Sequence, residues 1–224
     1  MQSTVLTESF SEPEFNISEV IRYCRAEAEE ELLEIINECM SECRDKLSYR
    51  VCYAEFDIDF KNGEIVFSFM TTDSTDLIKN LSGARSAVVF GASIGMEIDR
   101  LIIKYGRISP LKALVFQAIG AERIESLCDV FCEKLGEKYK KNGLYLKPRF
   151  SAGYGDFSLE YQKDIFRVLD CPRKIGLTLN ESLVMSPSKS VTAIIGISEF
   201  KDGCQDSACE GCGKADCEFR KGAF

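Results

Sequence analysis

Apolar residues recur along this chain with two different periods, one typical of helices and the other of strands. From Asn16 onward, Ile17, Val20 and Ile21 share one helical face, and Asn16 or Ser18 can cap that helix. The helical spacing predicts further helices over Leu32–Cys43, Thr75–Leu81 and Ser158–Leu169. A long helical region is predicted over Gly95–Lys141. It is expected to break at Gly106 and Pro110 and to bend at Gly120. Residues 1–15 contain Pro13 and several acids, and we expect an irregular lead-in there.

Alternation and β-branched residues predict the strands. Tyr49–Phe60 and Ile65–Phe69 flank Asn62-Gly63, which is a strong hairpin signal. Further strands are predicted over Ser86–Phe90, Ile175–Leu179 and Val191–Ile197. The predicted class is α+β, with helices packed on a mainly antiparallel sheet, in one domain over residues 1–200 followed by a Cys-rich tail over residues 201–224.

Charge and composition exclude several classes of function. The chain has 224 residues, 45% of them hydrophobic and 29% charged, as in ordinary soluble domains. Its formal net charge of −8 argues against binding nucleic acid or an anionic membrane surface. The first ten residues, MQSTVLTESF, do not form a signal peptide, and the apolar runs are too short to span a bilayer, so we expect a cytoplasmic protein.

Histidine is absent from the chain. Its absence excludes Ser-His-Asp triads, Cys-His dyads and His-ligated zinc.

The tail carries four cysteines in a short, Gly-rich segment, at Cys204, Cys209, Cys212 and Cys217. Four thiolates at such spacing can close a tetrahedral zinc site or hold an iron–sulfur cluster. The alternative is a flexible tail with redox-labile thiols. The helical pairs Cys39/Cys43 and Cys128/Cys132 are expected to pack as small apolar side chains.

Three sequence blocks stand in a characteristic order. Residues 149–155 read Arg-Phe-Ser-Ala-Gly-Tyr-Gly, which is similar to an R-x-x-x-G-Y-P signature. Residues 179–191 read LNESLVMSPSKSV, similar to L-T-E-S-x-x-M-x-P-x-x-S-V, and Phe131–Glu137 resembles an F-A-E-x-x-x-E helix. In this order they resemble the activation domain of cobalamin-dependent methionine synthase, in a short stand-alone form, over residues 124–198.

The resemblance implies that the chain binds S-adenosylmethionine and takes part in reductive methylation of an inactive cobalamin. The cobalamin would be carried by a methionine synthase or a related corrinoid protein, with an external electron donor. The chain would thus act as a component of a methyltransferase. The ligand is expected to lie against Arg149, Ser151, Ala152, Gly153 and Tyr154, with Glu133 receiving its ammonium.

The chemistry of these residues agrees with that expectation. An Arg fork pairs with a carboxylate in a bidentate way, a glycine lets backbone approach a ligand, and the Tyr154 ring offers a π-face to a sulfonium. Each residue also has a structural alternative. Arg149 would then pair with a surface carboxylate, residues 153–155 would form an ordinary turn, and Glu133 would be an exposed helix charge.

The chain departs from the family pattern at three positions, where a proline, an acid and a tyrosine are replaced by Gly155, Gly143 and Ile195. Loss of the acid and the phenol would weaken ligand binding. Two alternatives therefore stand beside an S-adenosylmethionine-binding accessory protein. One is a metal or redox protein serving another corrinoid methyltransferase, and the other is an interaction module that has lost the ligand.

Overall fold

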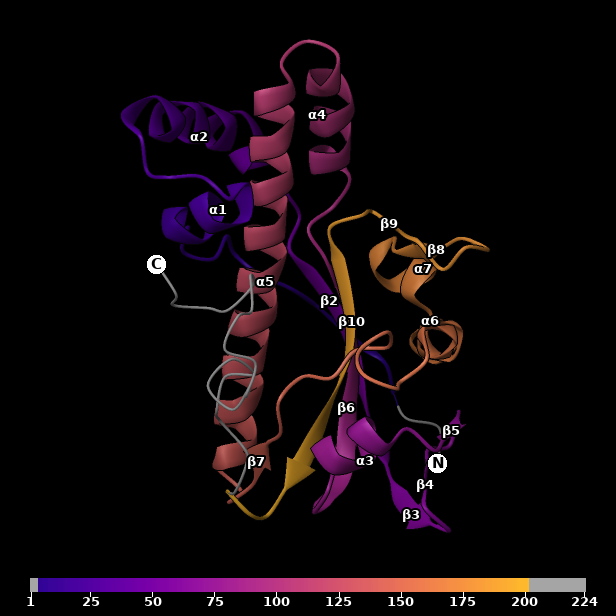
Figure 1. Ribbon diagram of the computed structural model, residues 1–224. Coiled ribbons are helices and arrows are strands. Elements are labelled where there is room, and N and C mark those ends of the chain that lie inside the picture. The colour runs from indigo at the N-terminus through magenta and orange to yellow at the C-terminus, as the bar shows by residue number, and fades with distance from the viewer. Residues whose placement is uncertain (1–3, 202–224) are drawn as a thin grey trace.

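A five-stranded antiparallel sheet runs through the middle of the protein and has helices on both faces (Figure 1). The structure is a computed structural model, and we describe residues 4–201. The strand order is β1-β2-β6-β10-β7. These strands are β1 (Leu6–Ser9), β2 (Arg50–Asp57), β6 (Ala84–Ser93), β7 (Tyr145–Leu146) and β10 (Ser190–Ser198).

The sequence pattern of each strand fits its place in the sheet. β6 is central, flanked by β2 and β10, and nine of its ten residues are buried. β2 alternates between the two faces: Val51 packs in one hydrophobic cluster, and Cys52, Ala54 and Phe56 pack in the other. Each face of the sheet therefore has its own core.

The longest helix, α5 (Pro110–Lys140), covers one face of the sheet (Figure 1). Ser109 caps its start by accepting a hydrogen bond from the Lys112 amide, and Pro110 occupies its first turn. Three further helices pack against α5, namely α1 (Ile17–Cys24), α2 (Glu30–Cys43) and α4 (Glu97–Gly106), and a 3₁₀ turn (Arg44–Lys46) follows α2.

The opposite face carries shorter elements. They are α3 (Thr75–Asn80), α6 (Gln162–Leu169), α7 (Cys171–Ile175), a 3₁₀ turn (Leu159–Tyr161), a small sheet of β3 (Asp59–Lys61), β4 (Glu64–Val66) and β5 (Thr71–Thr72), and the hairpin β8 (Thr178–Leu179) with β9 (Met185–Ser186). Both layers appear in Figure 1, with α5 to the left of the sheet and α6 and α7 to the right. The α+β class and the mainly antiparallel sheet are confirmed.

Several local predictions were wrong. The lead-in contains β1, which pairs with β2 along the sheet edge. The predicted hairpin is confined to β3 and β4, because β2 ends at Asp57 and pairs with β1 and β6 instead. The strand predicted over Ile175–Leu179 begins only at Thr178.

Within residues 4–201, no helix combines the length and the apolar character needed to cross a membrane.

Candidate functional site

The segment that carries the first sequence block runs beside β10. Phe150 and Ile194 exchange backbone hydrogen bonds of 2.9 and 2.8 Å. Phe150 packs in the cluster shared with α6 and α7. Because neighbouring side chains of an extended segment point to opposite faces, Arg149 is directed towards α5. The first block and the strand that ends the downstream block are thus side by side.

Arg149 forms ion pairs with two carboxylates of α5. Its NH2 group lies 2.8 Å from Asp129 Oδ1 and 3.2 Å from Glu125 Oε2. The Arg149 side chain is 24% exposed, whereas those of Glu125 and Asp129 are 36% and 48% exposed. Burial acts to lower the pKa of Arg149, but the negative charges that face it when it titrates at high pH, those of the Cys128 and Cys132 thiolates and of the two carboxylates, outweigh burial and raise the pKa. Arg149 is therefore a permanent, half-desolvated cation beside two anions.

Two thiols of α5 lie beside this ion-pair cluster. Burial raises the pKa of Cys132 to about 11 and raises that of Cys128 further, although Arg149 acts in the opposite direction on both. Both cysteines are therefore protonated at neutral pH, and the charge of the site comes from Arg149, Glu125 and Asp129.

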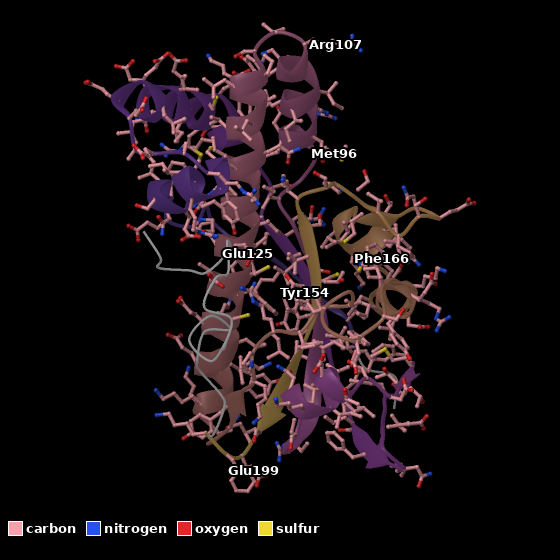
Figure 2. The ribbon with its side chains drawn as sticks, in the orientation of Figure 1. Met96, Arg107, Glu125, Tyr154, Phe166 and Glu199 are labelled. Carbon is pink, nitrogen blue, oxygen red and sulfur yellow. The ribbon has the colours of Figure 1, made fainter. Side chains whose placement is uncertain are left out.

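The loop after Phe150 presents Tyr154 to solvent. Gly153 donates its N–H to the Phe157 carbonyl at 2.7 Å, and Tyr154 donates to the Ser151 carbonyl at 3.2 Å. Ala152 is buried, whereas Tyr154 is 67% exposed. Figure 2 shows Tyr154 near the middle of the molecule, between the ribbons of α5 and α6, with Glu125 on α5 close by in the view. An exposed phenol ring and a guanidinium thus come from one short loop.

The proline-to-glycine departure at position 155 has a structural reason. Gly155 has φ +53°, whereas proline is restricted to a φ near −65°. A Cβ at this position would also stand 2.1 Å from Asp76 Oδ2. This loop therefore requires glycine and follows a different path from one that a proline would allow.

Asp156 fastens the same loop to the first turn of α3. Its carboxylate accepts hydrogen bonds from the Ser74 and Thr75 hydroxyls at 2.5 and 2.6 Å and from the Thr75 amide at 2.8 Å. In return, Asp156 donates its own N–H to Asp76 Oδ2 at 3.3 Å. The hydrogen bonds from Ser74 and Thr75 lower the pKa of Asp156.

We expect this contact to make the protein less stable in acid. A carboxyl whose folded-state pKa is depressed contributes stability above its unfolded pKa of about 3.9, and the contribution is lost as pH falls through the folded pKa. Asp156→Asn should lower the urea midpoint at pH 7, and the difference from the parent chain should shrink as pH falls below about 4. The measurement is urea unfolding by circular dichroism at several pH values. A difference that stays constant down to pH 2 would contradict this account.

Glu133 lies on α5 and is exposed. The carboxylates that pair with Arg149 are instead Asp129 and Glu125, about one and two turns earlier on the helix. Sequence reasoning missed both. Their i,i+4 spacing next to the Phe131–Glu137 block was the available signal, since such residues share a helix face.

The downstream block forms the β8–β9 hairpin and leads into β10. Leu183 lies at the turn with φ +61°, and Glu181 and Ser182 are exposed there. Beyond the hairpin, Lys189 Nζ donates to Gln117 Oε1 at 2.6 Å. This contact ties the start of β10 to α5, eight residues before Glu125.

Two of the family positions that differ here fall outside the ion-pair cluster. Ile195 is buried in the core under α5, and Gly143 lies in the turn after α5 with φ +70°. Neither supplies a polar group towards a ligand.

A separate polar cavity of about 410 Å³ lies at the far end of α5. It is lined by Glu55, Arg85, Tyr139, Asn142, Gly143, Leu144 and Glu199. Figure 2 shows Glu199 at the opposite end of the view from Arg107 and well below Tyr154, and the lining does not include Arg149, Glu125 or Asp129, so this cavity is distinct from the cluster around Arg149.

The predicted metal ligands Cys204, Cys209, Cys212 and Cys217 lie outside the described residues. Between residues 4 and 201, no group of three or more Cys, Asp and Glu side chains is placed to hold a metal ion. The zinc or iron–sulfur site stays a prediction.

The fold is similar to that of a solved protein. Neither a family model nor a curated protein sequence matches the chain. Its structure superposes on a crystal structure of the MetH reactivation domain bound to AdoHcy with a TM-score of 0.63. The match covers 91% of this chain and 79% of that chain at 14% sequence identity, so the two proteins share a fold.

Proposed function

We propose that this chain binds S-adenosylmethionine beside Arg149 and presents its methyl group to a cobalamin carried by a partner protein. The observation that carries the proposal is the cluster of Arg149, Glu125 and Asp129 next to the Tyr154 loop. The cluster occurs on the fold of a domain whose crystal structure contains AdoHcy.

The charges of the cluster suit the amino-acid end of the ligand. S-adenosylmethionine carries an α-carboxylate and an α-ammonium on one carbon. A guanidinium binds the carboxylate, and a nearby acid binds the ammonium, as charge-assisted hydrogen bonds. Arg149 supplies the cation, and Asp129 and Glu125 supply the anions. We assign ammonium binding to this acid pair rather than to Glu133.

Tyr154 suits the sulfonium. Its ring is exposed, and the ring centroid lies 6.5 Å from that of Phe150. A cation placed over such a face gains about 0.5–2 kcal/mol. The neutral sulfur of S-adenosylhomocysteine lacks this cation–π attraction. S-adenosylhomocysteine should therefore bind more weakly than S-adenosylmethionine.

We assign the cobalamin to a partner protein. The chain has no histidine to ligate cobalt, so the methyl group would be transferred across an interface. The partner fitting this role is a cobalamin-binding methionine synthase or a related corrinoid protein, supplied with electrons by an external donor.

One observation favours the alternative of an interaction module that has lost the ligand. Arg149 is paired with two acids of its own chain, which is what a module that has lost the ligand would retain for stability. Binding measurements distinguish the two functions.

We expect calorimetric titration of the full chain with S-adenosylmethionine to show one site, and Arg149→Ala to weaken it at least tenfold. The reason is that hydrogen bonds to a charged group contribute about 1.5–3 kcal/mol, and about 1.4 kcal/mol is a factor of ten. Arg149→Lys should recover only part of the affinity, because the ammonium lacks the planar fork.

Arg167→Ala is the matched control, since Arg167 is exposed on α6 and pairs with Asp164. Its affinity should equal that of the parent chain. Unchanged affinity in folded Arg149→Ala would remove Arg149 from the site. Absence of binding to the parent chain would favour the interaction module.

A further inference from the structure

Two buried cysteines from distant parts of the chain touch each other. Cys52 Sγ on β2 and Cys171 Sγ at the start of α7 are 3.8 Å apart, although the two residues are 119 positions apart in the sequence. Both side chains are fully buried. Both are free cysteines.

The sheet leaves room for this pair. Gly91 is the register partner of Cys52 on β6. A Cβ on Gly91 would lie 3.2 Å from Cys171 Sγ and 3.6 Å from Cys52 Sγ. The hydrogen of a glycine therefore faces the two sulfurs, and the space between β6 and α7 is filled by thiols.

We propose that Cys52 and Cys171 are a redox-active dithiol, a covalent modification site that a small-molecule disulfide oxidises to an internal disulfide. The reaction consumes two thiols and one small-molecule disulfide. It yields the Cys52–Cys171 bond and two small-molecule thiols, which take up the two protons.

The geometry allows the bond with a small movement. A disulfide has sulfurs about 2.05 Å apart, so the two atoms must approach by less than 2 Å. Cys52 is fixed in an interior strand of the sheet, whereas Cys171 begins a five-residue helix at the edge of the second layer. We expect α7 to make the adjustment.

The two thiols are also unequal. The hydrogen bond from Cys171 lowers the pKa of Cys52 and raises that of Cys171. The thiolate is the attacking form in thiol–disulfide exchange. Local opening of α7 would expose Cys171 and remove the burial and the hydrogen bond that raise its pKa. The Cys171 thiolate would then attack the small-molecule disulfide and release one small thiol, and Cys52 would attack Sγ of Cys171 in the mixed disulfide as α7 closes, releasing the second small thiol. Because both sulfurs are buried, formation and reduction should both be slow.

The bond would fix the second layer to the sheet. α7 leads directly into β8 and the downstream sequence block, so the disulfide would hold that hairpin in place. This inference is independent of the proposed function and of the tail cysteines.

The test is peptide mapping of the full-length chain after prolonged incubation with glutathione disulfide, with alkylation of the remaining thiols. We expect one peptide pair joined through Cys52 and Cys171, and a melting temperature raised by roughly 5–15 °C for closure of so long a loop. Dithiothreitol should reverse both changes.

Two control variants and one internal comparison test whether the link joins Cys52 to Cys171 and not to other cysteines. A full-length variant with Cys204, Cys209, Cys212 and Cys217 changed to serine should form the same link, and Cys171→Ser should lose it. The helical pair Cys39 and Cys43, also buried, is an internal comparison and should be alkylated as free thiols. Full alkylation of Cys52 and Cys171 after oxidation, or a link from either to another cysteine, would overturn the proposal.

Discussion

An Arg123→Ala chain is expected to lose about 3–5 kcal/mol of its free energy of unfolding. Arg123 lies on α5 with no exposed surface, and its guanidinium lies against Glu122, which is 2% exposed. The Nε–Oε2 and NH2–Oε1 distances are 2.5 and 2.6 Å, so the pair is bidentate. Removing the cation leaves a buried carboxylate without its partner, which is the costly way to break such a pair.

The same pair fastens the N-terminal segment to α5. Arg123 donates to the carbonyls of Pro13 and Glu14 at 2.7 and 2.6 Å, and Glu122 accepts from the Asn16 amide at 3.1 Å. Asn16 in turn caps α1. Loss of Arg123 should therefore release residues 13–16 and loosen the start of α1 as well.

Urea unfolding followed by circular dichroism measures the loss. Arg123→Lys retains the charge but not the fork, and it should recover only part of the stability. The double change Glu122→Met with Arg123→Met should cost less than the two single changes summed, because it leaves no unpaired charge. A loss below about 1 kcal/mol for Arg123→Ala would show that water or another group compensates for the missing cation.

How much of the fold the sequence predicts depends on how local each signal is. The buried strand β6 and the break before α5 were predicted, because apolar runs and the Gly106 and Pro110 signals act within a few residues. β1 was not, because LTES carries no strand pattern of its own and is held by pairing with residues 50–53. The Asn62-Gly63 signal identified a turn correctly but not which strands it joins, because β2 continues to its own partners in the large sheet.

In the candidate site, too, local motifs were predictable from the sequence and contacts between distant residues were not. The Gly-Tyr block was recognised from a short motif. Its place beside β10 and the choice of Glu125 and Asp129 over Glu133 were not predicted, because they depend on which strand and which turn of α5 pass Arg149 and Phe150 in space. The Asp156–Thr75 contact joins residues 81 positions apart, and only the folded chain brings them together.

The proposed function requires more than ligand binding, because the bound methyl group must reach cobalt on another protein. In the test we propose, a cobalamin-dependent methionine synthase that lacks its own activation domain is first oxidised to the inactive cob(II)alamin form. We expect addition of this chain, S-adenosylmethionine and a one-electron reductant to restore turnover. The electron and the methyl cation together yield methylcobalamin, and S-adenosylhomocysteine is released.

Proximity is the reason to expect a large effect. Holding methyl donor and cobalt in one complex replaces a bimolecular encounter with an effectively intramolecular transfer, and well-oriented intramolecular reactions reach effective molarities of about 10⁵ M or more. Omission of any one of chain, S-adenosylmethionine or reductant should therefore leave the enzyme inactive.

Arg149→Ala should reduce the recovery at subsaturating S-adenosylmethionine by at least the tenfold expected for its affinity, whereas Arg167→Ala should not change it. The Arg149 variant should regain part of the recovery as the concentration of S-adenosylmethionine rises, because docking on the partner does not depend on that guanidinium. Full recovery of the natural partner enzyme without this chain would contradict the accessory role, even if S-adenosylmethionine binds. Recovery that needs the chain but is unaffected by Arg149→Ala at every ligand concentration would instead place the methyl donor elsewhere on the complex.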